Sequence, residues 1–238
     1  MKIALVGYGK MGKTIDRLAV EKGWEVVLRI DLNNRAEFNT QNLQKADVVI
    51  EFSRPESAFE NISTCLRAGV PVVSGTTGWL DRFEEIKALC KQQKGGFIYA
   101  SNFSIGVNLF FALNEYLADM MKDHPDYDVD MEEIHHTQKL DAPSGTAITL
   151  AQGILAKINA KNQWVNHPSD QQTDLSIISK RTDPAPGTHS IRYHSAIDDI
   201  QITHTAHSRE GFAKGALLAA KWLTGKEGVF EMRNVLGF

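Results

Sequence analysis

The sequence predicts an α/β protein with two domains, in which a parallel sheet covered by helices is followed by an α+β domain. Through the first hundred residues, short β-branched runs alternate with segments of helical apolar spacing. From about Asp126 the chain becomes rich in strand-like runs. With 238 residues, 42% of them hydrophobic, the chain can bury one large core or two ordinary ones.

Five β-branched runs are the expected strands of the first domain: Lys2–Val6, Trp24–Ile30, Val48–Phe52, Pro71–Ser74 and Phe97–Ala100. Apolar residues at helical spacing separate most of them, and one of these helices is expected to end at Gly69. The stretch Asn33–Lys45 is short and polar, so this crossover is expected to lack a regular helix. Because strands that alternate with helices form right-handed βαβ units, the predicted sheet is parallel.

The second domain is expected to contain a mixed or antiparallel sheet. Its predicted strands are Val129–His136, Leu175–Lys180, His189–His194 and Ile200–Ala206, and its one clear predicted helix is Ser144–Lys157. A final helix has a ridge of small residues that includes Gly215 and Ala219, which suits close packing on the first domain. The predicted domains are therefore residues 1–102 with 212–238, and residues 103–211.

Composition excludes several classes of function. The 26 basic and 29 acidic side chains give a net charge of −3, whereas nucleic-acid binders usually carry a basic excess. No run approaches the roughly 18 apolar residues of a membrane span, and early glycines interrupt any signal-peptide pattern. Cys65 and Cys90 have no CxxC spacing and suit a reducing compartment. We expect a cytoplasmic protein with neither nucleic-acid nor membrane partners.

A glycine-rich loop follows the first predicted strand and opens a helix. It consists of Gly7, Tyr8, Gly9, Lys10, Met11 and Gly12. Glycines allow a tight turn and let backbone N–H groups approach a pyrophosphate. Asp31 ends the second strand, where a carboxylate can accept hydrogen bonds from an adenosine ribose. The glycine-rich loop and Asp31 together predict a Rossmann-type dinucleotide site. The alternative is a tight turn and an acidic strand end that bind no ligand.

Polar residues also follow the later strands, at the carboxyl edge where open α/β sheets bind ligands. The candidates after the fourth and fifth strands are Gly75, Thr76, Thr77, Ser101, Asn102, Phe103 and Ser104. Arg54 follows the third strand. It can meet a phosphate or adenine, or be a solvated loop charge, and the sequence favours neither.

The segment Glu133–Ala147 has the greatest density of reactive side chains. His135 and His136 are adjacent at a strand end, so they point to opposite faces and have different roles. This disfavours a shared zinc ion, and we expect no metal. Four more histidines are expected at strand surfaces: His189, His194, His204 and His207. His204 shares its face with Ile200 and Ile202, so we expect it to be partly buried.

Further along the same segment, Lys139 can act as a cation or proton donor beside an anion. Gly145 and Thr146 then open a helix, whose exposed N–H groups suit a carboxylate. The structural alternative makes Ser144 a helix cap, Lys139 a solvated charge and the histidines hydrogen-bonded members of the sheet. That alternative is reasonable for each residue alone and less so for all of them together.

These motifs resemble the 4-hydroxy-tetrahydrodipicolinate reductase family, also called dihydrodipicolinate reductase, of bacterial lysine and diaminopimelate synthesis. The resemblance covers essentially the whole chain, and its most specific block is EIHHTQKLDAPSGTA. The segments SGTTG, SNFSIGVN and SREGFAKGALLAAKWLTGKEGVF add to it. The resemblance implies a nicotinamide-binding Rossmann domain and a second domain for substrate binding and oligomerisation. It also implies a homotetramer that reduces a small dicarboxylate to tetrahydrodipicolinate.

The resemblance also implies residue roles. His135 matches the family's catalytic acid/base and Lys139 its proton donor, while His136, Gly145 and Thr146 match its substrate contacts. Its cofactor contacts are matched by the glycine loop, by Asp31, and by Gly75–Thr77 and Ser101–Ser104. The glycine loop is one residue shorter than the longer form common in the family. The cofactor atoms that Lys10 and Met11 would contact therefore stay open.

The end of the second strand predicts the cofactor preference. Asp31 favours a free ribose 2′-hydroxyl, whereas an adjacent arginine would accommodate a 2′-phosphate, and here Leu32 follows directly. Arg35 and Lys10 are close enough in sequence to reach a phosphate. We therefore expect NADH to be preferred and NADPH to be usable.

Two other functions fit parts of the sequence. A different two-domain Rossmann oxidoreductase, such as a semialdehyde dehydrogenase, would need another catalytic set, for example a nucleophilic cysteine. Cys65 and Cys90 lie in helix-like stretches without a nearby histidine. A non-enzymatic NAD(H) sensor would keep the glycine loop but has no need of Lys139.

Overall fold

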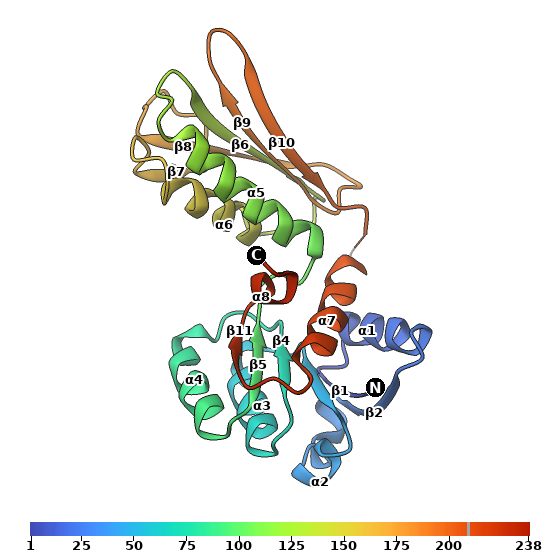
Figure 1. Ribbon diagram of the computed structural model, residues 1–238. Coiled ribbons are helices and arrows are strands. Elements are labelled where there is room, and N and C mark those ends of the chain that lie inside the picture. The colour runs from blue at the N-terminus through green and yellow to red at the C-terminus, as the bar shows by residue number, and fades with distance from the viewer. Residues whose placement is uncertain (209) are drawn as a thin grey trace. The chain divides into compact units, whose positions relative to one another are not determined.

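The computed structural model describes residues 1–208 and 210–238, which form two units (Figure 1). Unit 1 comprises Met1–Ile105 and Glu210–Phe238, and unit 2 comprises Gly106–Arg209. These boundaries lie a few residues from the expected ones. Because the chain leaves unit 1 and later returns to it, unit 2 is an insertion between two parts of unit 1.

Unit 1 is built on a six-stranded parallel sheet with the order β11-β5-β4-β3-β1-β2. Its strands are β1 (Lys2–Val6), β2 (Glu25–Ile30), β3 (Val48–Glu51), β4 (Val72–Ser74), β5 (Gly96–Tyr99) and β11 (Gly228–Phe230). The five predicted runs are all confirmed as strands of this sheet. The sequence prediction lacks β11, because three residues that begin with glycine carry no alternating pattern.

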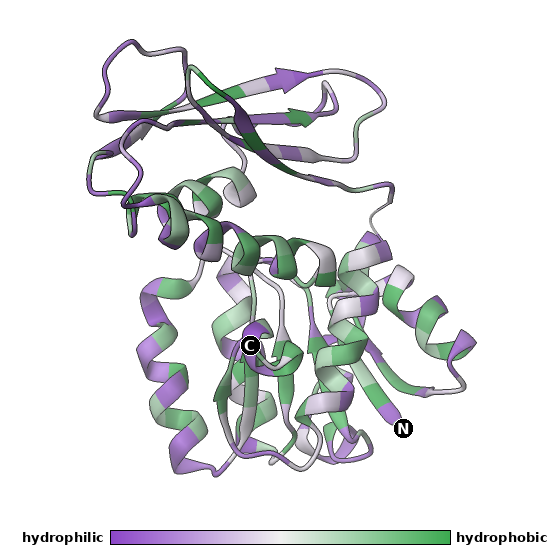
Figure 2. Cartoon of the chain, turned by 45° about the horizontal axis from the view of Figure 1, so that its top comes forward, coloured by the Kyte–Doolittle hydropathy of each residue, from purple (hydrophilic) through white to green (hydrophobic). Residues whose placement is uncertain are grey.

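Helices cover both faces of this sheet. They are α1 (Lys10–Glu21), α3 (Pro55–Arg67), α4 (Phe83–Gln92), α7 (Glu210–Leu223) and α8 (Met232–Leu236). Ile3 and Leu5 of β1 pack in one core cluster with α1 and α7, whereas Ala4 and Val6 pack in another with α3 and α4. A strand buried on both faces is a continuous apolar run, and Figure 2 shows the inner strands as hydrophobic.

The crossover from β2 to β3 contains only short helical turns, as its polar sequence predicts. It has a 3₁₀ segment, η1 (Leu32–Glu37), and a one-turn helix, α2 (Thr40–Leu43). A second 3₁₀ turn, η2 (Leu80–Arg82), precedes α4. Asp31 caps η1 and Asn39 caps α2, each through its side chain.

Unit 2 contains a five-stranded mixed sheet with the order β10-β9-β6-β8-β7. Its elements are α5 (Ile105–Met121), β6 (Asp128–His135), α6 (Gly145–Leu155), β7 (Gln163–Val165), β8 (Asp174–Arg181), β9 (Thr188–His194) and β10 (Asp199–Thr205). β6 pairs parallel with β8 and antiparallel with β9. The α+β prediction is therefore confirmed.

The helices α5 and α6 pack on one face of the unit 2 sheet. Phe110 and Leu117 of α5 and Leu150 of α6 form a core cluster with Val129 and Met131 of β6. The sequence prediction does not include α5. Its apolar residues surround the whole helix, so no amphipathic period appears in the sequence.

Within residues 1–208 and 210–238, no helix has the length and apolar composition needed to cross a bilayer.

Candidate functional site

The glycine loop joins β1 to α1, and two of its glycines are required by packing. Gly7 has a φ of +94°, and a Cβ there would lie 1.9 Å from the carbonyl oxygen of Phe52. A Cβ on Gly12 would lie 2.3 Å from the carbonyl oxygen of Gly7. Only glycine allows the loop to turn this tightly.

Gly9 is different, because the space beside it is open. A Cβ there would meet no described atom within 4 Å. Gly9 is the N-cap of α1, and no described side chain caps that helix. The first N–H groups of a helix need partners, and the helix dipole favours an anion there. The loop therefore leaves an open, uncapped helix start that suits an anionic group such as a phosphate.

The loop side chains mainly fix the loop in place. The Tyr8 hydroxyl donates a hydrogen bond to the Asp16 carboxylate. Arg29 binds the same carboxylate through Nε at 2.6 Å and Nη2 at 2.9 Å, and its hydrogen bonds lower the pKa of Asp16. Lys10 is exposed and Met11 half-buried. Tyr8 thus ties the loop to α1 and β2, and its hydroxyl is used within the protein.

Asp31 lies exposed at the end of β2, where the sequence predicts the ribose contact. Its Oδ1 accepts a hydrogen bond from the backbone N–H of Leu32 at 2.8 Å. Arg35, the candidate partner of a 2′-phosphate, donates to Asn61 Oδ1 at 2.9 Å. The Arg35 guanidinium also lies 4.8 Å from the ring centre of Phe38. Arg35 is therefore held by protein contacts.

The candidates after β3 and β4 surround a buried glutamate, Glu51. The Thr76 hydroxyl donates to Glu51 Oε1 at 2.8 Å and accepts a hydrogen bond from Ser53 N–H at 2.8 Å. The Thr76 side chain thus joins two strand ends, and its carbonyl oxygen accepts a hydrogen bond from Trp79 Nε1 at 2.7 Å, so its role toward a cofactor stays a prediction. Gly75 packs against Phe52, while Thr77 and Arg54 are exposed.

The segment after β5 divides between core and surface. Phe103 is 1% exposed and its ring lies 5.8 Å from that of Phe52, so it belongs to the core rather than to a ligand surface. Asn102 is buried and accepts a hydrogen bond from Ser104 N–H at 2.9 Å. Ser101 is exposed. The resemblance assigns all four to the cofactor, but the Phe103 side chain supports the fold.

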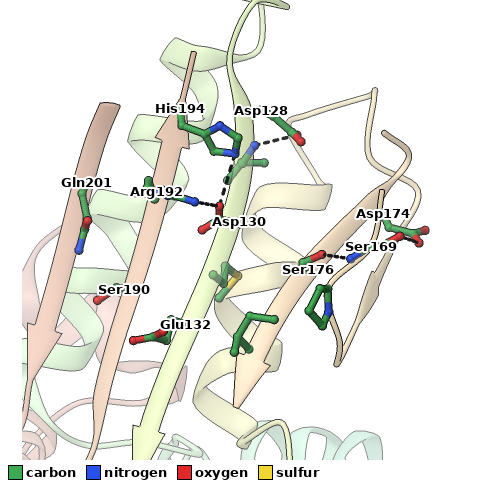
Figure 3. Close-up of a pocket in the computed structure, with 14 residues that line it drawn as sticks. Asp128, Asp130, Glu132, Ser169, Asp174, Ser176, Ser190, Arg192, His194 and Gln201 are labelled. Atoms are coloured by element: carbon green, nitrogen blue, oxygen red, sulfur yellow. Dashed lines mark hydrogen bonds and ion pairs between the residues drawn. The ribbon is translucent and has the colours of Figure 1, made fainter. Parts of the chain in front are cut away.

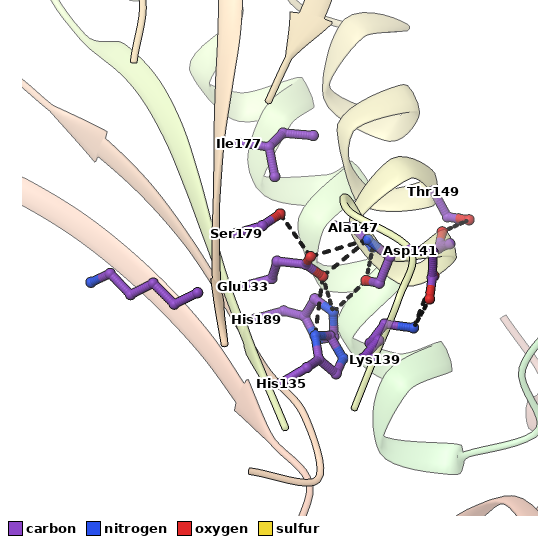
Figure 4. Close-up of polar contacts among 12 residues, drawn as sticks. Glu133, His135, Lys139, Asp141, Ala147, Thr149, Ile177, Ser179 and His189 are labelled. Carbon is purple, nitrogen blue, oxygen red and sulfur yellow. Dashed lines mark hydrogen bonds and ion pairs between the residues drawn. The ribbon is translucent and has the colours of Figure 1, made fainter. Parts of the chain in front are cut away.

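In unit 2, a polar cluster lies at the end of β6 (Figure 4). Alternate residues of this strand face inward: Val129 and Met131 are apolar, and Glu133 and His135 follow. The Glu133 carboxylate is fully buried. Its Oε1 accepts hydrogen bonds from Ser179 Oγ at 2.8 Å and Arg181 Nη2 at 3.1 Å.

Glu133 also reaches the start of α6 and the ring of His135. Its two oxygens lie 3.1 and 3.2 Å from the backbone nitrogen of Ser144. Its Oε2 lies 3.3 Å from His135 Nδ1. Burial alone would raise the pKa of Glu133, but contacts with His135, Ser144 and Ser179 outweigh burial and lower it far below its ordinary value. Glu133 is therefore a carboxylate.

His189 is part of this cluster, and the expectation that it lies at a strand surface is wrong. It is 5% exposed, and its Nε2 lies 3.2 Å from Ser144 Oγ. Its ring centre is 5.1 Å from that of His135. Burial and the nearby His135 lower the pKa of His189 to about 4. The strand alternation that it shares with Ile191 and Tyr193 could have predicted its burial.

The other three histidines expected at strand surfaces, His194, His204 and His207, are half-buried or exposed. The sequence prediction did not include two residues of the cluster, Ser179 and Arg181. They come from β8, which lies beside β6, and no local motif marks them.

Lys139 and the start of α6 complete the polar segment. Lys139 Nζ lies 2.8 and 2.9 Å from the two oxygens of Asp141, and its hydrogen bonds lower the pKa of Asp141. Ser144 caps α6 by accepting from the backbone N–H of Ala147 at 3.2 Å. Gly145 is exposed, and Thr146 and His136 are half-buried. This segment can present a cation and a helix N-terminus to an anion.

The side chains of Glu133, His135 and His189 have ligand atoms within 4.8 Å of one another, a spacing that could hold a metal ion. However, the Arg181 guanidinium lies 3.1 Å from the same carboxylate and would repel a cation. We therefore interpret the cluster as a hydrogen-bonded network.

A polar hollow lies over the sheet of unit 2 and is lined by β6, β8, β9 and β10 (Figure 3). On it, Arg192 Nη2 lies 2.5 Å and His194 Nε2 3.4 Å from the carboxylate of Asp130. The charges are paired across strands, which is typical of a sheet surface.

Comparison with known proteins places the chain in a family. A model described as "Dihydrodipicolinate reductase, N-terminus" matches residues 1–103, and one described as "Dihydrodipicolinate reductase, C-terminus" matches residues 106–236. The chain belongs to the dihydrodipicolinate reductase family. The two matches meet where unit 1 leads into unit 2, and the resemblance inferred from EIHHTQKLDAPSGTA is confirmed.

Relatives match along the whole length. A 4-hydroxy-tetrahydrodipicolinate reductase of Christiangramia forsetii is 50% identical over 236 residues, covering 99% of this chain and 98% of the relative. One from Methanoregula boonei is 31% identical over 252 residues, with 99% and 98% covered.

Solved structures share the fold. A dipicolinate-bound dihydrodipicolinate reductase from Paenisporosarcina sp. TG-14 has a TM-score of 0.78 at 24% identity, with 97% of each chain covered. An amine dehydrogenase from Mycobacterium smegmatis has a TM-score of 0.61 at 10% identity, covering 97% of this chain and 94% of that one. The fold is thus shared with the amine dehydrogenase as well as with the reductase.

Proposed function

We propose that this chain, an enzyme that reduces 4-hydroxy-tetrahydrodipicolinate in lysine and diaminopimelate biosynthesis, binds NAD(P)H in unit 1 and its dicarboxylate substrate in unit 2. The observation that carries this assignment is the polar segment after β6. There a lysine, two histidines and a helix N-terminus follow one another within Glu133–Ala147. Such a concentration of cationic and donor groups suits a dianion in a chain whose net charge is −3.

In the proposed reaction, the hydroxylated ring first loses water to give a conjugated imine. When bound in unit 1, the dihydronicotinamide supplies a hydride to the ring. The enamine that results must take up a proton. We assign this proton to the Lys139 ammonium. His135 is assigned to the earlier loss of water, in which it takes one proton from the ring and returns one to the departing hydroxyl.

The substrate carboxylates are assigned to the start of α6. Backbone N–H groups at Gly145 and Thr146, the Thr146 hydroxyl and His136 are the proposed contacts. A substrate carboxylate would replace Asp141 as the partner of Lys139, because both are anions of the same chemistry.

In unit 1, the proposed cofactor contacts are the glycine loop, Asp31, and the strand ends at Arg54, Gly75–Thr77 and Ser101–Ser104. Thr76 and Phe103 would contribute backbone groups only, because their side chains are used within the protein. We propose that NADH is preferred. Asp31 is exposed where a 2′-phosphate would lie, and Arg35 is already bound to Asn61. Lys10 is exposed beside the loop, which keeps NADPH usable.

We also propose a cytoplasmic homotetramer assembled through the sheets of unit 2. Its helices cover one face of the sheet, and β10, at the edge, has mostly exposed residues. An edge strand with unpaired backbone groups is a natural place for pairing between chains. Cys65 and Cys90 are free thiols, which suits a reducing compartment.

The test of the activity is oxidation of NADH and NADPH with substrate generated in situ from pyruvate and aspartate semialdehyde. Lys139→Ala is expected to lower kcat by about 10²- to 10⁴-fold, typical of a positioned acid, with the Kd for NADH unchanged. Lys180→Ala is the matched control, since Lys180 is an exposed lysine of the same unit that pairs with Glu132. A Lys139→Ala enzyme with normal kcat and a raised KM would reassign Lys139 to binding.

A further inference from the structure

We infer that Glu133 is a positioning residue for His135, which it holds with the proton on Nδ1 so that Nε2 is the nitrogen that exchanges protons with the substrate. The inference rests on the proposed acid/base role of His135. Glu133 would support that role without touching the substrate, because it acts only through the His135 ring.

The Glu133 carboxylate is held in one orientation by several donors. One oxygen, Oε1, is bound by Ser179 Oγ and Arg181 Nη2, both from β8. The backbone N–H of Ser144 spans both oxygens. With these donors in place the carboxylate cannot rotate freely, and Oε2 stays turned toward the histidine rings (Figure 4).

Two histidine rings lie near Glu133 Oε2, and His135 is the closer one. His135 Nδ1 lies 3.3 Å from it and His189 Nε2 lies 3.7 Å from it. His189 Nε2 is closer to Ser144 Oγ, at 3.2 Å. Because the Ser144 oxygen already accepts from the N–H of Ala147, its hydrogen is available to donate to His189 Nε2. With Ser144 Oγ as its nearer partner, His189 Nε2 is engaged away from Glu133, and His135 Nδ1 is the ring nitrogen that lies closer to Oε2.

The opposite side of the His135 ring lies beside a glycine. A Cβ on Gly187 would lie 3.0 Å from His135 Nε2, and Gly187 has a φ of +153°. Glycine therefore leaves space beside this nitrogen that a side chain would take. Nδ1 lies against a carboxylate and Nε2 lies against a glycine, so the two nitrogens have distinct surroundings.

The distance of 3.3 Å is long, and Nδ1 makes no hydrogen bond of good geometry with any described residue. Hydrogen bonds of acid/base groups are often long without substrate and shorten in the complex. The other charged or titratable groups around the pair are Arg181 on β8, His189 on β9, His204 on β10, and Lys139 and Asp141 in the loop.

The test combines kinetics with ¹⁵N NMR of the histidine side chains. In the wild type, the ring nitrogens of His135 should show the Nδ1–H tautomer. In Glu133→Gln, kcat should fall by about 10- to 100-fold, as for second partners of functional histidines, and the tautomer should become mixed. The KM for NADH should stay within about twofold, because unit 1 is unaltered. The pH profile of kcat should also shift, since a charge beside the ring is lost.

Two further variants distinguish loss of the Glu133 charge from loss of folding and from a general effect of removing a carboxylate. Glu133→Asp retains the charge and should recover part of the lost kcat, and it stands in for Glu133→Gln if that variant does not fold. Glu132→Gln is the matched control, because this neighbouring carboxylate points to the other face of β6 and pairs with Lys180.

The outcomes separate the two hypotheses. His135→Gln with normal kcat would overturn the proposed role of His135. His135→Gln with low kcat, together with Glu133→Gln that keeps both normal kcat and the Nδ1–H tautomer, would overturn the positioning role alone. Glu133→Gln that loses stability while its kcat, pH profile and tautomer are unaltered would make Glu133 a purely structural residue.

Discussion

Two glutamates show how the partners of a buried carboxylate decide its charge. Glu51 and Glu133 are both fully buried. Burial raises the pKa of Glu51, although hydroxyl groups of Ser53, Ser74 and Thr76 donate to it. The pKa of Glu133 is lowered, because hydrogen bonds from His135, Ser144 and Ser179 outweigh the effect of burial there. The hydrogen bonds therefore outweigh burial at Glu133 and fail to do so at Glu51.

Asp31 allows a test of cofactor preference at a single side chain. Wild-type enzyme is expected to have a higher kcat/KM with NADH than with NADPH, because the exposed carboxylate repels a 2′-phosphate. Asp31→Ala should move the ratio toward NADPH by roughly tenfold, about 1.4 kcal/mol. Initial rates with both cofactors measure this. A wild type that prefers NADPH tenfold, or a variant with the same ratio, would contradict the assignment.

His189 makes the stability of the fold depend on pH. Its folded pKa of about 4 lies below the ordinary value of 6.5. As the pH falls from about 6.5 toward 4, the unfolded chain binds a proton at this residue that the folded chain does not, so the free energy of unfolding decreases. The loss should be on the order of 1–3 kcal/mol. His189→Asn should show a smaller loss in urea unfolding at pH 7 and pH 5.

The comparison of pH 7 with pH 5 lies above the pH range in which protonation of Glu133 lowers the free energy of unfolding. Its pKa lies below the ordinary value of 4.5, so its contribution is lost only as the pH falls further. An identical loss in wild type and His189→Asn between pH 7 and 5 would show that His189 is not the source.

At the scale of elements, the regular alternation of apolar and polar residues made β6 predictable. The elements that the sequence prediction lacks, α5, β7 and β11, have no such pattern. The strand alternates inward and outward residues along its length, and its sequence runs close to the expected Val129–His136. In α5, exposed positions such as Leu109, Leu113 and Tyr116 are also apolar, so the sequence does not distinguish the buried face from the exposed one. β7 and β11 each have three residues, too few for a period to appear.

The close packing of α7 gives a prediction for one helix. A Cβ on Gly215 would lie 1.7 Å from the carbonyl oxygen of Phe103, so backbone would have to move. Gly215→Ala is expected to lower the free energy of unfolding by about 1–3 kcal/mol or more, in spite of alanine's better helix propensity. Lys214→Ala, an exposed change in the same helix, should have little effect. Urea unfolding measures both, and equal stability of the two variants would contradict the packing argument.

For the molecule as a whole, sequence motifs predicted the site residues that are close together in the sequence. They did not predict the residues that come together only because their strands are neighbours in the sheet. Gly7–Gly12 and Glu133–Ala147 are continuous in sequence and carry their own signals. Ser179, Arg181 and His189 reach Glu133 only because β8 and β9 flank β6. Phe103 was assigned to the cofactor by its position in a motif, although its side chain is a core residue.

The assembly prediction concerns the sheet of unit 2. Light scattering at micromolar concentration should give about four times the chain mass of 26.5 kDa. Ile200→Asp, on the exposed edge strand β10, should reduce the mass, because a charge there opposes pairing. Val20→Glu, an exposed apolar site on α1 of unit 1, is the control. A monomeric wild type would exclude the tetramer.

The insertion of unit 2 into unit 1 has a consequence for synthesis on the ribosome. Strand β11 pairs with β5, and α7 packs on α1 and buries Ala216 and Ala220 in the core of unit 1. Both elements belong to Glu210–Phe238 and are translated after every strand of unit 2. Domains usually fold in the order of their synthesis. Here the unit translated first is completed last, so the nascent chain must hold an open β5 edge and an uncovered α1 face until translation is nearly finished.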